Sequence, residues 1–159
     1  MTPPRALLCF DGSNDALGAI RESGELLGPR AATLLTVWEP LATWAPYDPA
    51  TVLSGGLSGL AAEELGLDQI AEGLGRETME RGLAVAREAG FDAVGQLSCG
   101  KPWRVICETA EELRAAPIVI GARGLSRVQS LLLGGVSAAV VAHAQRPVLL
   151  IPSARKEAD

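Results

Sequence analysis

The feature that most constrains this chain is its alternation of short apolar runs with helical patterns. Five runs have the length of strands and few polar interruptions, which is typical of buried parallel strands. The segments between them carry apolar residues at spacings of three and four, which indicates helices. Strands and helices that alternate along a chain predict a parallel sheet covered on both faces. The predicted strands are residues 6–10, 31–38, 91–98, 118–120 and 147–152.

The first predicted helix carries signals at both of its ends. Ser13 is a favourable N-cap, and Asp15 follows in the first turn, where the helix dipole stabilises a carboxylate. Gly28-Pro29 ends the pattern. We therefore expect a helix over about residues 14–27, with one face made by Leu17, Ile20, Gly24 and Leu27.

The second helical segment, residues 57–90, is less regular. Gly66, Gly73, Gly75 and Gly82 lower its helix propensity, so we expect a broken or kinked helix. Its predicted apolar faces are Leu67, Ile70 and Leu74, and, slightly out of phase, Met79, Leu83 and Ala86.

Two further helices are predicted after the third and fourth strands. Gly100-Lys101-Pro102 opens the earlier one, because proline is well suited to a first helical position. The later one begins at Val136. Their predicted faces are Trp103, Ile106, Ala110 and Leu113, and Val136, Ala139, Val140 and His143.

Right-handed crossovers make such a sheet doubly wound. Ligands then bind beyond the carboxyl ends of the strands, where the direction of winding reverses. Phe10-Asp11-Gly12 follows the first predicted strand, and Ile120-Gly121 follows the fourth. If these two strands are neighbours, the binding site lies between their ends.

Residues 118–137 resemble a phosphate cradle in their arrangement of strand, glycine-bounded loop and helix. Gly121 ends the apolar run, Gly124 follows three residues later, and Gly134-Gly135 closes the loop before the helix. Bare backbone N–H groups and a helix N-terminus stabilise bound anions. A tight turn alone would also need glycine after a strand, but it would not need the second glycine pair, so we favour phosphate contact.

Composition excludes several other functions. The chain of 159 residues has a net charge of −5, which argues against nucleic-acid binding, and no apolar stretch approaches the length of a membrane span. Its three cysteines are too few and too irregular for a disulfide framework or a zinc site, and they fit a cytoplasmic setting. No signal peptide is expected. We expect one domain over residues 1–159, with an irregular insert at 39–56 and a polar tail at 153–159.

Motifs of several enzyme classes are missing from the sequence. There is no G-x4-G-K-[ST] segment, no G-x-G-x-x-G after the first strand and no G-x-S-x-G elbow. His143 has no partners for a catalytic triad. We therefore predict no catalytic residues and no metal site.

The chain resembles the universal stress protein family over nearly its whole length. The matching segments are LLCFDGSNDALGAI, GARG, LLLGGVSAAVVAHA and RPVLLIP. ATP-binding members carry G-x2-G-x9-G followed by Ser, Thr or Asn, and Gly121, Gly124 and Gly134 keep that spacing. Gly135 departs from the pattern, because it supplies no side-chain hydrogen bond. The resemblance implies a doubly wound α/β fold of the adenine-nucleotide alpha-hydrolase-like type. Its five parallel strands would run in the order 3-2-1-4-5, with dimerisation through the last strand, residues 147–152.

The resemblance also implies a set of nucleotide-binding residues. Asp11 would bind a ribose hydroxyl, with helix capping as the alternative, and the main chain of Val37 would meet the adenine edge. Ser137 would either replace part of the grip lost at Gly135 or cap the helix. Arg123 would pair with phosphate or stay solvated, and Arg127 is a weaker candidate. The full set is Phe10, Asp11, Val37, Ile120, Gly121, Arg123, Gly124, Gly134, Gly135, Val136 and Ser137.

These expectations lead to one function and one alternative. The first is a module that binds ATP, or ADP or AMP, holds any Mg²⁺ through the phosphates and performs little or no catalysis. The alternative is a universal stress protein that binds no nucleotide and acts through its dimer and partner surfaces, a reading that the glycine at position 135 keeps open.

Overall fold

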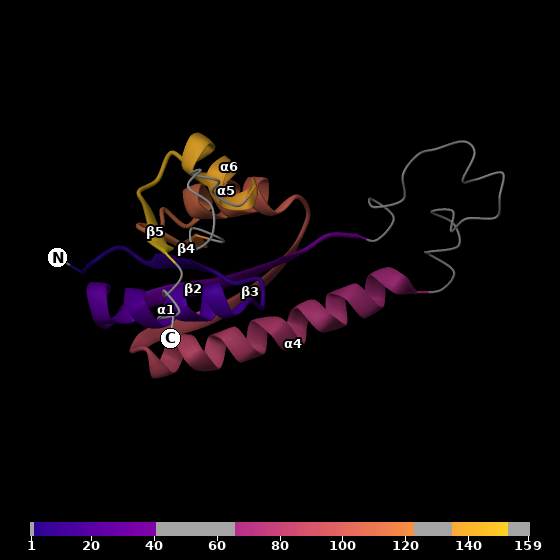
Figure 1. Cartoon of the computed structure of the whole chain (residues 1–159), viewed down its shortest axis with the longest axis horizontal. Helices are drawn as coiled ribbons and strands as arrows, with labels where there is room; N and C mark the ends of the chain where they lie inside the picture. Colours follow the sequence, from indigo (N-terminus) through magenta and orange to yellow (C-terminus); the bar gives the residue numbers. More distant parts are fainter. Residues whose placement is uncertain (1, 41–65, 123–134, 153–159) are drawn as a thin grey trace, which may run out of the picture.

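A five-stranded parallel sheet forms the centre of the protein, in the order β3-β2-β1-β4-β5 (Figure 1). The computed structural model describes residues 2–40, 66–122 and 135–152. The predicted fold class and strand order are both confirmed. The strands are β1 (Ala6–Cys9), β2 (Arg30–Trp38), β3 (Phe91–Cys99), β4 (Ile118–Ala122) and β5 (Val148–Pro152). The helices are α1 (Asn14–Leu27), α4 (Leu67–Glu88), α5 (Pro102–Glu112) and α6 (Gly135–His143).

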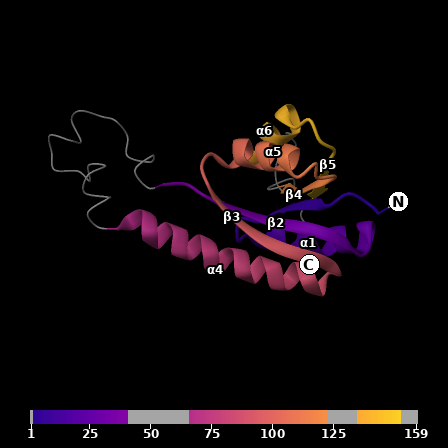
Figure 2. The same cartoon turned by 180° about the vertical axis from the view of Figure 1, so that it is seen from behind.

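Helices α1 and α4 cover one face of the sheet, and α5 and α6 cover the other (Figures 1 and 2). Because side chains alternate along a strand, β1 contributes to two separate cores. Leu8 and Phe10 pack with α1 and α4, whereas Leu7 and Cys9 pack with α5 and α6. β1 and β4 are neighbours, so the winding of the sheet reverses between their ends, as the sequence predicts.

Helix α1 has the ends that its sequence predicts. The Ser13 hydroxyl accepts a hydrogen bond from the Ala16 N–H at 3.2 Å, and Gly28 is the C-cap residue. Ile20 and Gly24 of the predicted face are buried, while Leu17 and Leu27 are partly buried against the same core. Local capping signals therefore determine the start and end of this helix.

Helix α4 differs from the prediction, because it runs unbroken over 22 residues. Two of its glycines face the sheet: Gly75 lies against Leu97 and Trp38, and Gly82 lies against the ring of Phe10. Their missing side chains let the helix approach the strands, so close packing offsets their poor helix propensity. The predicted face of Leu67, Ile70 and Leu74 is also wrong, since Ile70 is 56% and Leu74 60% exposed. The second predicted face, made by Met79, Leu83 and Ala86, packs on the core.

The end of β4 and the start of α6 also differ from the prediction. Gly121 does not end the strand, because β4 continues to Ala122, with Gly121 in register with Ile151. Helix α6 spans Gly135–His143, so Gly135 is already helical, although the prediction starts the helix at Val136. Its buried residues are Ser137 and Val140, whereas Val136 is 39% exposed and His143 is exposed. The predicted face is therefore only partly correct, because Val140 is buried but Val136 and His143 are exposed.

Several expectations fall outside the described residues. They include the irregular segment at 39–56 beyond Pro40, the first part of the predicted second helix and the tail at 153–159. The loop that closes the glycine motif, residues 123–134, also lies outside them.

Candidate functional site

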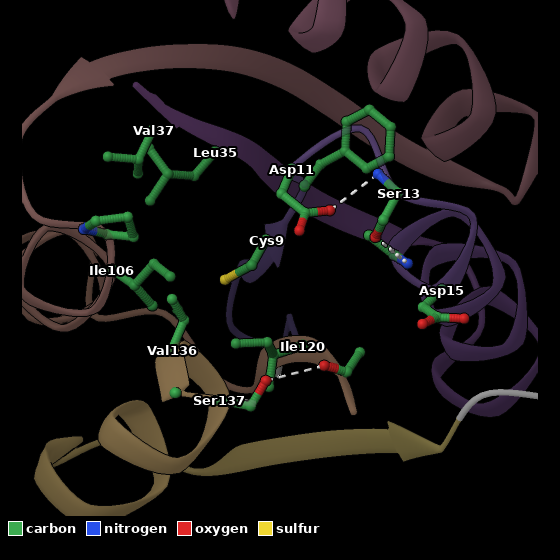
Figure 3. A pocket seen from close by; sticks show the side chains of 15 residues that line it. Cys9, Asp11, Ser13, Asp15, Leu35, Val37, Ile106, Ile120, Val136 and Ser137 are labelled. Carbon is green, nitrogen blue, oxygen red and sulfur yellow. Dashed lines mark hydrogen bonds between the residues drawn. The ribbon is translucent and has the colours of Figure 1, made fainter. Parts of the chain in front are cut away.

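A cavity of about 420 Å³ opens at the carboxyl ends of β1, β2 and β4, on the face covered by α5 and α6 (Figure 3). Its size falls within the usual range for small-molecule sites, about 300–1,000 Å³. The cavity lies where the winding of the sheet reverses, as the topology predicts. Its described lining residues are Cys9, Phe10, Asp11, Ser13, Asp15, Ala16, Leu35, Val37, Pro102, Ile106, Ile120, Gly121, Gly135, Val136 and Ser137.

The floor of the cavity is apolar. Cys9, Leu35 and Ile120 come from the sheet, and Ile106 comes from α5. All four are buried, with exposed fractions of 9% or less. Burial, with a smaller contribution from nearby Cys107, raises the pKa of the Cys9 thiol to about 12. Cys9 is therefore a neutral, weakly polar part of an apolar floor at ordinary pH.

The turn between β1 and α1 supplies the polar rim. One Asp11 carboxylate oxygen accepts a hydrogen bond from the Ser13 N–H at 2.9 Å. Gly12 has φ +88°, a conformation that side chains rarely adopt. The cap of α1 comes from Ser13 and not from Asp11, so the capping alternative for Asp11 is replaced by a role in the turn. Asp11 also lines the cavity, as Figure 3 shows.

Gly121 and Ser137 join β4 to its neighbouring helices. A side chain at Gly121 would come within 3.2 Å of the Asp15 carbonyl oxygen, so this glycine lets the start of α1 approach β4. The Ser137 hydroxyl donates to the Gly121 carbonyl at 3.0 Å and is 5% exposed. The hydroxyl proton is therefore used in a hydrogen bond within the protein. This bond is neither the phosphate contact nor the helix cap that the sequence predicts for Ser137.

The first turn of α6 borders the cavity with backbone groups. Gly135 and Val136 are exposed, and a side chain added at Gly135 would meet nothing within 4 Å. N–H groups in the first turn of a helix have no partner inside that helix. Because α1 and α5 also begin at this edge, three helix N-termini lie near the cavity. Their partial positive charges favour an anionic ligand and offset the negative charges of Asp11 and Asp15.

Val37 contributes its main chain to the site. Backbone N–H and C=O groups of successive strand residues point alternately to the two neighbouring strands. The Leu35 carbonyl accepts from the Phe10 N–H on the β1 side, and the Trp38 carbonyl accepts from the Gly100 N–H on the β3 side. The backbone groups of Val37 therefore point to the β1 side, where the pairing with β1 has already ended. They give the edge of the cavity one donor and one acceptor side by side.

Most of the predicted site residues come together in this cavity. Phe10, Asp11, Val37, Ile120, Gly121, Gly135, Val136 and Ser137 all line it, whereas Arg123, Gly124 and Gly134 lie outside the described residues. The Phe10 ring itself packs against Gly82 on the opposite face of the sheet.

Sequence reasoning missed the residues of the cavity floor and of α5. Cys9, Leu35 and Ile106 resemble ordinary core residues in sequence, and only strand alternation from Asp11 and Val37 would have placed the first two on this face. Pro102 was predicted as a helix start but not as part of the site. The start of α5 follows the end of β3, so the same carboxyl-edge argument would have found it.

The described residues hold neither a metal-binding cluster nor a membrane-spanning helix. Across residues 2–40, 66–122 and 135–152, there is no group of three or more His, Cys, Asp or Glu side chains arranged to hold a metal. No helix in this part of the chain is long and apolar enough to cross a membrane.

The fold is a doubly wound α/β sheet with a cavity where its winding reverses, and comparison with known proteins gives the family. The Universal stress protein family matches residues 4–152, so the chain belongs to that family. The "Universal stress protein in QAH/OAS sulfhydrylase 3'region" of Thermus aquaticus is 36% identical over 154 residues, which cover 91% of this chain and 96% of that protein.

Two other relatives match over shorter segments. The "Universal stress protein A-like protein" of Arabidopsis thaliana is 39% identical over 64 residues, covering 40% of this chain and 37% of that protein. Universal stress protein MJ0531 of Methanocaldococcus jannaschii is 32% identical over 83 residues, covering 52% of this chain and 49% of that protein. The chain thus matches less than half the length of each of these two relatives.

Solved structures share the fold at low sequence identity. Hypothetical protein MJ0577 superposes with a TM-score of 0.71 at 21% identity, covering 99% of this chain and all of that one. A universal stress protein in complex with cAMP gives 0.63 at 21% identity, covering 96% and 98%. An Arabidopsis thaliana family member with AMP bound gives 0.62 at 20% identity, covering 99% and 97%. Two of these three structures therefore hold an adenine nucleotide.

Proposed function

We propose that this universal stress protein binds ATP, or ADP or AMP, in the cavity at the carboxyl ends of β1, β2 and β4. The observation that carries the proposal is the arrangement of the cavity itself. An apolar floor lies between a backbone donor–acceptor pair at Val37 and the first turn of α6. The Val37 pair and the apolar floor suit a base, and the first turn of α6 suits a phosphate.

The base fits the inner part of the cavity. Adenine presents a ring nitrogen acceptor beside an amino donor, which complements the N–H and C=O of Val37. Its flat faces pack on apolar side chains, and Leu35, Ile106 and Cys9 provide such a surface. A neutral Cys9 thiol suits this contact, since a thiolate there would have to be buried without a partner.

The sugar and the phosphates extend toward the rim. Asp11 stands at the end of β1, where its carboxylate can accept from a ribose hydroxyl. Phosphate oxygens would bind the first-turn N–H groups of Gly135, Val136 and Ser137. Gly121 supports this geometry by letting α1 approach β4, and Arg123, Gly124 and Gly134 are proposed to complete the phosphate contacts from sequence.

We further propose a binding role with little or no catalysis. Within the described lining, the carboxylates are Asp11 and Asp15, and neither stands beside a histidine or lysine that would make a base and nucleophile pair. Any Mg²⁺ would be held by the phosphates. The free thiols Cys9, Cys99 and Cys107 suit a cytoplasmic protein. Strand β5 lies at one edge of the sheet, where a second copy would cover it in a homodimer.

The direct test is to identify and titrate the ligand. Mass spectrometry of the purified protein would identify retained nucleotide, and calorimetry would measure ATP, ADP, AMP and adenosine binding to the stripped protein. We expect measurable binding of at least one nucleotide. Asp11→Asn should lower AMP affinity about tenfold by removing the charged ribose acceptor. Asp92→Asn, an exposed change on β3, is the matched control. No binding at millimolar nucleotide would refute the proposal.

A second variant tests the glycine motif. Gly124→Val should block phosphate binding by placing a side chain where the backbone must approach the ligand. If nucleotide affinity is unchanged in this variant, the phosphates do not contact that loop.

A second candidate function rests on position 135. Without a hydroxyl at the start of α6, the site lacks one charge-assisted hydrogen bond. In this alternative, the protein binds no nucleotide and acts through its dimer and partner surfaces. The calorimetric titration above distinguishes the two functions.

A further inference from the structure

A residue of α4 contacts the turn between β1 and α1, which carries Asp11. Asp11 lies between Phe10 and Gly12, and Arg81 contacts both of these neighbours. Its guanidinium Nη2 donates to the Gly12 carbonyl at 2.6 Å. Its guanidinium carbon also lies 5.7 Å from the centre of the Phe10 ring, which is within the range of a cation–π contact.

Packing around the same turn supports this contact. A side chain at Gly12 would lie 3.2 Å from both Thr78 Cγ2 and Arg81 Nη2, so the turn rests directly on α4. A side chain at Gly82 would overlap the Phe10 ring. Two consecutive turns of α4 therefore contact the residues on either side of Asp11. Arg81 and Gly12 are 69 positions apart in the sequence.

Two further hydrogen bonds hold the residues on either side of Gly12. The Phe10 N–H donates to the Leu35 carbonyl, and the Ser13 N–H donates to the Asp11 carboxylate. The Gly12 carbonyl is not part of the α1 hydrogen-bond ladder, which begins with the Ser13 carbonyl. Arg81 thus holds the Gly12–Ser13 peptide group, whose N–H donates to the Asp11 carboxylate.

We propose that Arg81 is a positioning residue for the nucleotide site: by holding the Gly12 carbonyl and the Phe10 ring, it keeps the Asp11 carboxylate directed at the ribose. The inference rests on the proposed function, because it assigns Asp11 a ligand. It places a site determinant on α4, a helix that does not itself line the cavity.

The chain provides a matched control on the same helix. Arg76 is also an exposed arginine of α4, but its guanidinium pairs with Glu72 at 2.9 Å, four residues away. Arg76→Ala therefore also removes one arginine side chain and its positive charge from α4, but it leaves the contacts of the turn unchanged. Arg81→Lys keeps the charge and one donor, and Arg81→Gln keeps a neutral donor.

The first experiment needs no ligand. Hydrogen exchange, resolved by residue, is compared in Arg81→Ala, Arg76→Ala and the parent protein. We expect the Ser13 amide, which bonds to Asp11, to exchange about threefold to tenfold faster in Arg81→Ala alone, the change expected from losing one hydrogen bond. Equal exchange in the two variants would overturn the proposal.

The second experiment asks whether the turn matters for the ribose. Calorimetry with AMP should show affinity reduced about threefold to tenfold by Arg81→Ala, partly restored in Arg81→Lys and unchanged in Arg76→Ala. Free adenine, which has no ribose, should bind equally to all of these variants. Adding Arg81→Ala to Asp11→Asn should cause no further loss, because both changes remove the same contact.

The outcomes separate this inference from the proposed function. If the parent protein binds no nucleotide, the proposed function fails, and the positioning of Asp11 toward a ribose fails with it. If AMP binds but Arg81→Ala and Arg76→Ala behave alike, only the role of Arg81 is overturned. An equal loss of free adenine and AMP in Arg81→Ala would also overturn it, since that result indicates general loosening.

Discussion

The two faces of the sheet are built from alternate residues of the same strands, yet they are packed differently at the carboxyl edge. On the face of α1 and α4, Gly82 lets the Phe10 ring approach so closely that no side chain would fit. On the face of α5 and α6, the same edge opens into a cavity of about 420 Å³. Phe10 fills the first face, and its neighbours Cys9 and Asp11 line the second.

This difference indicates that the face of α1 and α4 supports the fold, whereas the face of α5 and α6 is open to a ligand. A face packed to contact resists displacement, because interiors have few voids and transmit strain. The face with the cavity keeps its donors and helix N-termini available for a ligand. The close packing of α4 against Phe10 and Gly12 therefore gives the opposite face a rigid edge on which to hold Asp11.

The largest expected effect comes from filling the packed face. Gly82→Val would place side-chain atoms in the space of the Phe10 ring, so we expect a loss of about 3 kcal/mol in the free energy of unfolding, measured by urea denaturation. Gly73→Ala on the same helix is the control. A side chain at Gly73 meets nothing within 4 Å, so this change should stabilise the protein by about 0.5–1 kcal/mol. Similar effects of the two changes would contradict the contrast between a packed and an open position.

A smaller effect is expected from adding a hydroxyl on the open face. Gly135→Ser has room for its side chain at the start of α6 and supplies the hydrogen bond that the glycine lacks. We expect ATP affinity to rise about tenfold or more, measured by calorimetry. Gly135→Ala, which adds a side chain without a donor, should give no comparable gain. Equal affinities for the serine and alanine variants would indicate that position 135 does not face the phosphates.

The smallest effect concerns the titration of the cavity floor. Burial raises the pKa of Cys9 from 9.0 to about 12, so the folded protein retains a proton that the unfolded chain loses above pH 9. The contribution of Cys9 to stability is complete below pH 9 and declines as pH rises toward 12. Between pH 9 and pH 10, the parent protein should lose about 1 kcal/mol of unfolding free energy more than Cys9→Ala does. Parallel pH profiles of the two proteins would show that this thiol is not protected from ionisation.

Sequence reasoning worked best where the signal was local or periodic. Ser13 and Gly28 mark the ends of α1 through their own capping chemistry, and Pro102 starts α5 as expected. The alternation of strands and helices predicted the doubly wound sheet, and the end of β1 predicted where Asp11 would lie. Family resemblance added the strand order and Val37, whose backbone groups point to the cavity edge for a reason visible only in the strand register.

Tertiary contacts decided the features that local patterns described wrongly. Gly75 and Gly82 look like helix breakers in sequence, but in the fold they are positions of close approach, because their neighbours come from distant strands. Ile70 and Leu74 look like an apolar face, yet they are exposed, since α4 turns its small residues to the sheet.

The sequence by itself determined the class of fold, the ends of α1 and the edge of the sheet that carries the site. Hydrophobic periodicity and capping act within a few residues, so they can be recognised in a linear chain. Only the tertiary structure decided that the Ser137 hydroxyl bonds to Gly121 and that Arg81 holds the turn at Gly12. Those partners lie 16 and 69 residues apart, and no local pattern records which distant groups a fold brings within hydrogen-bond distance.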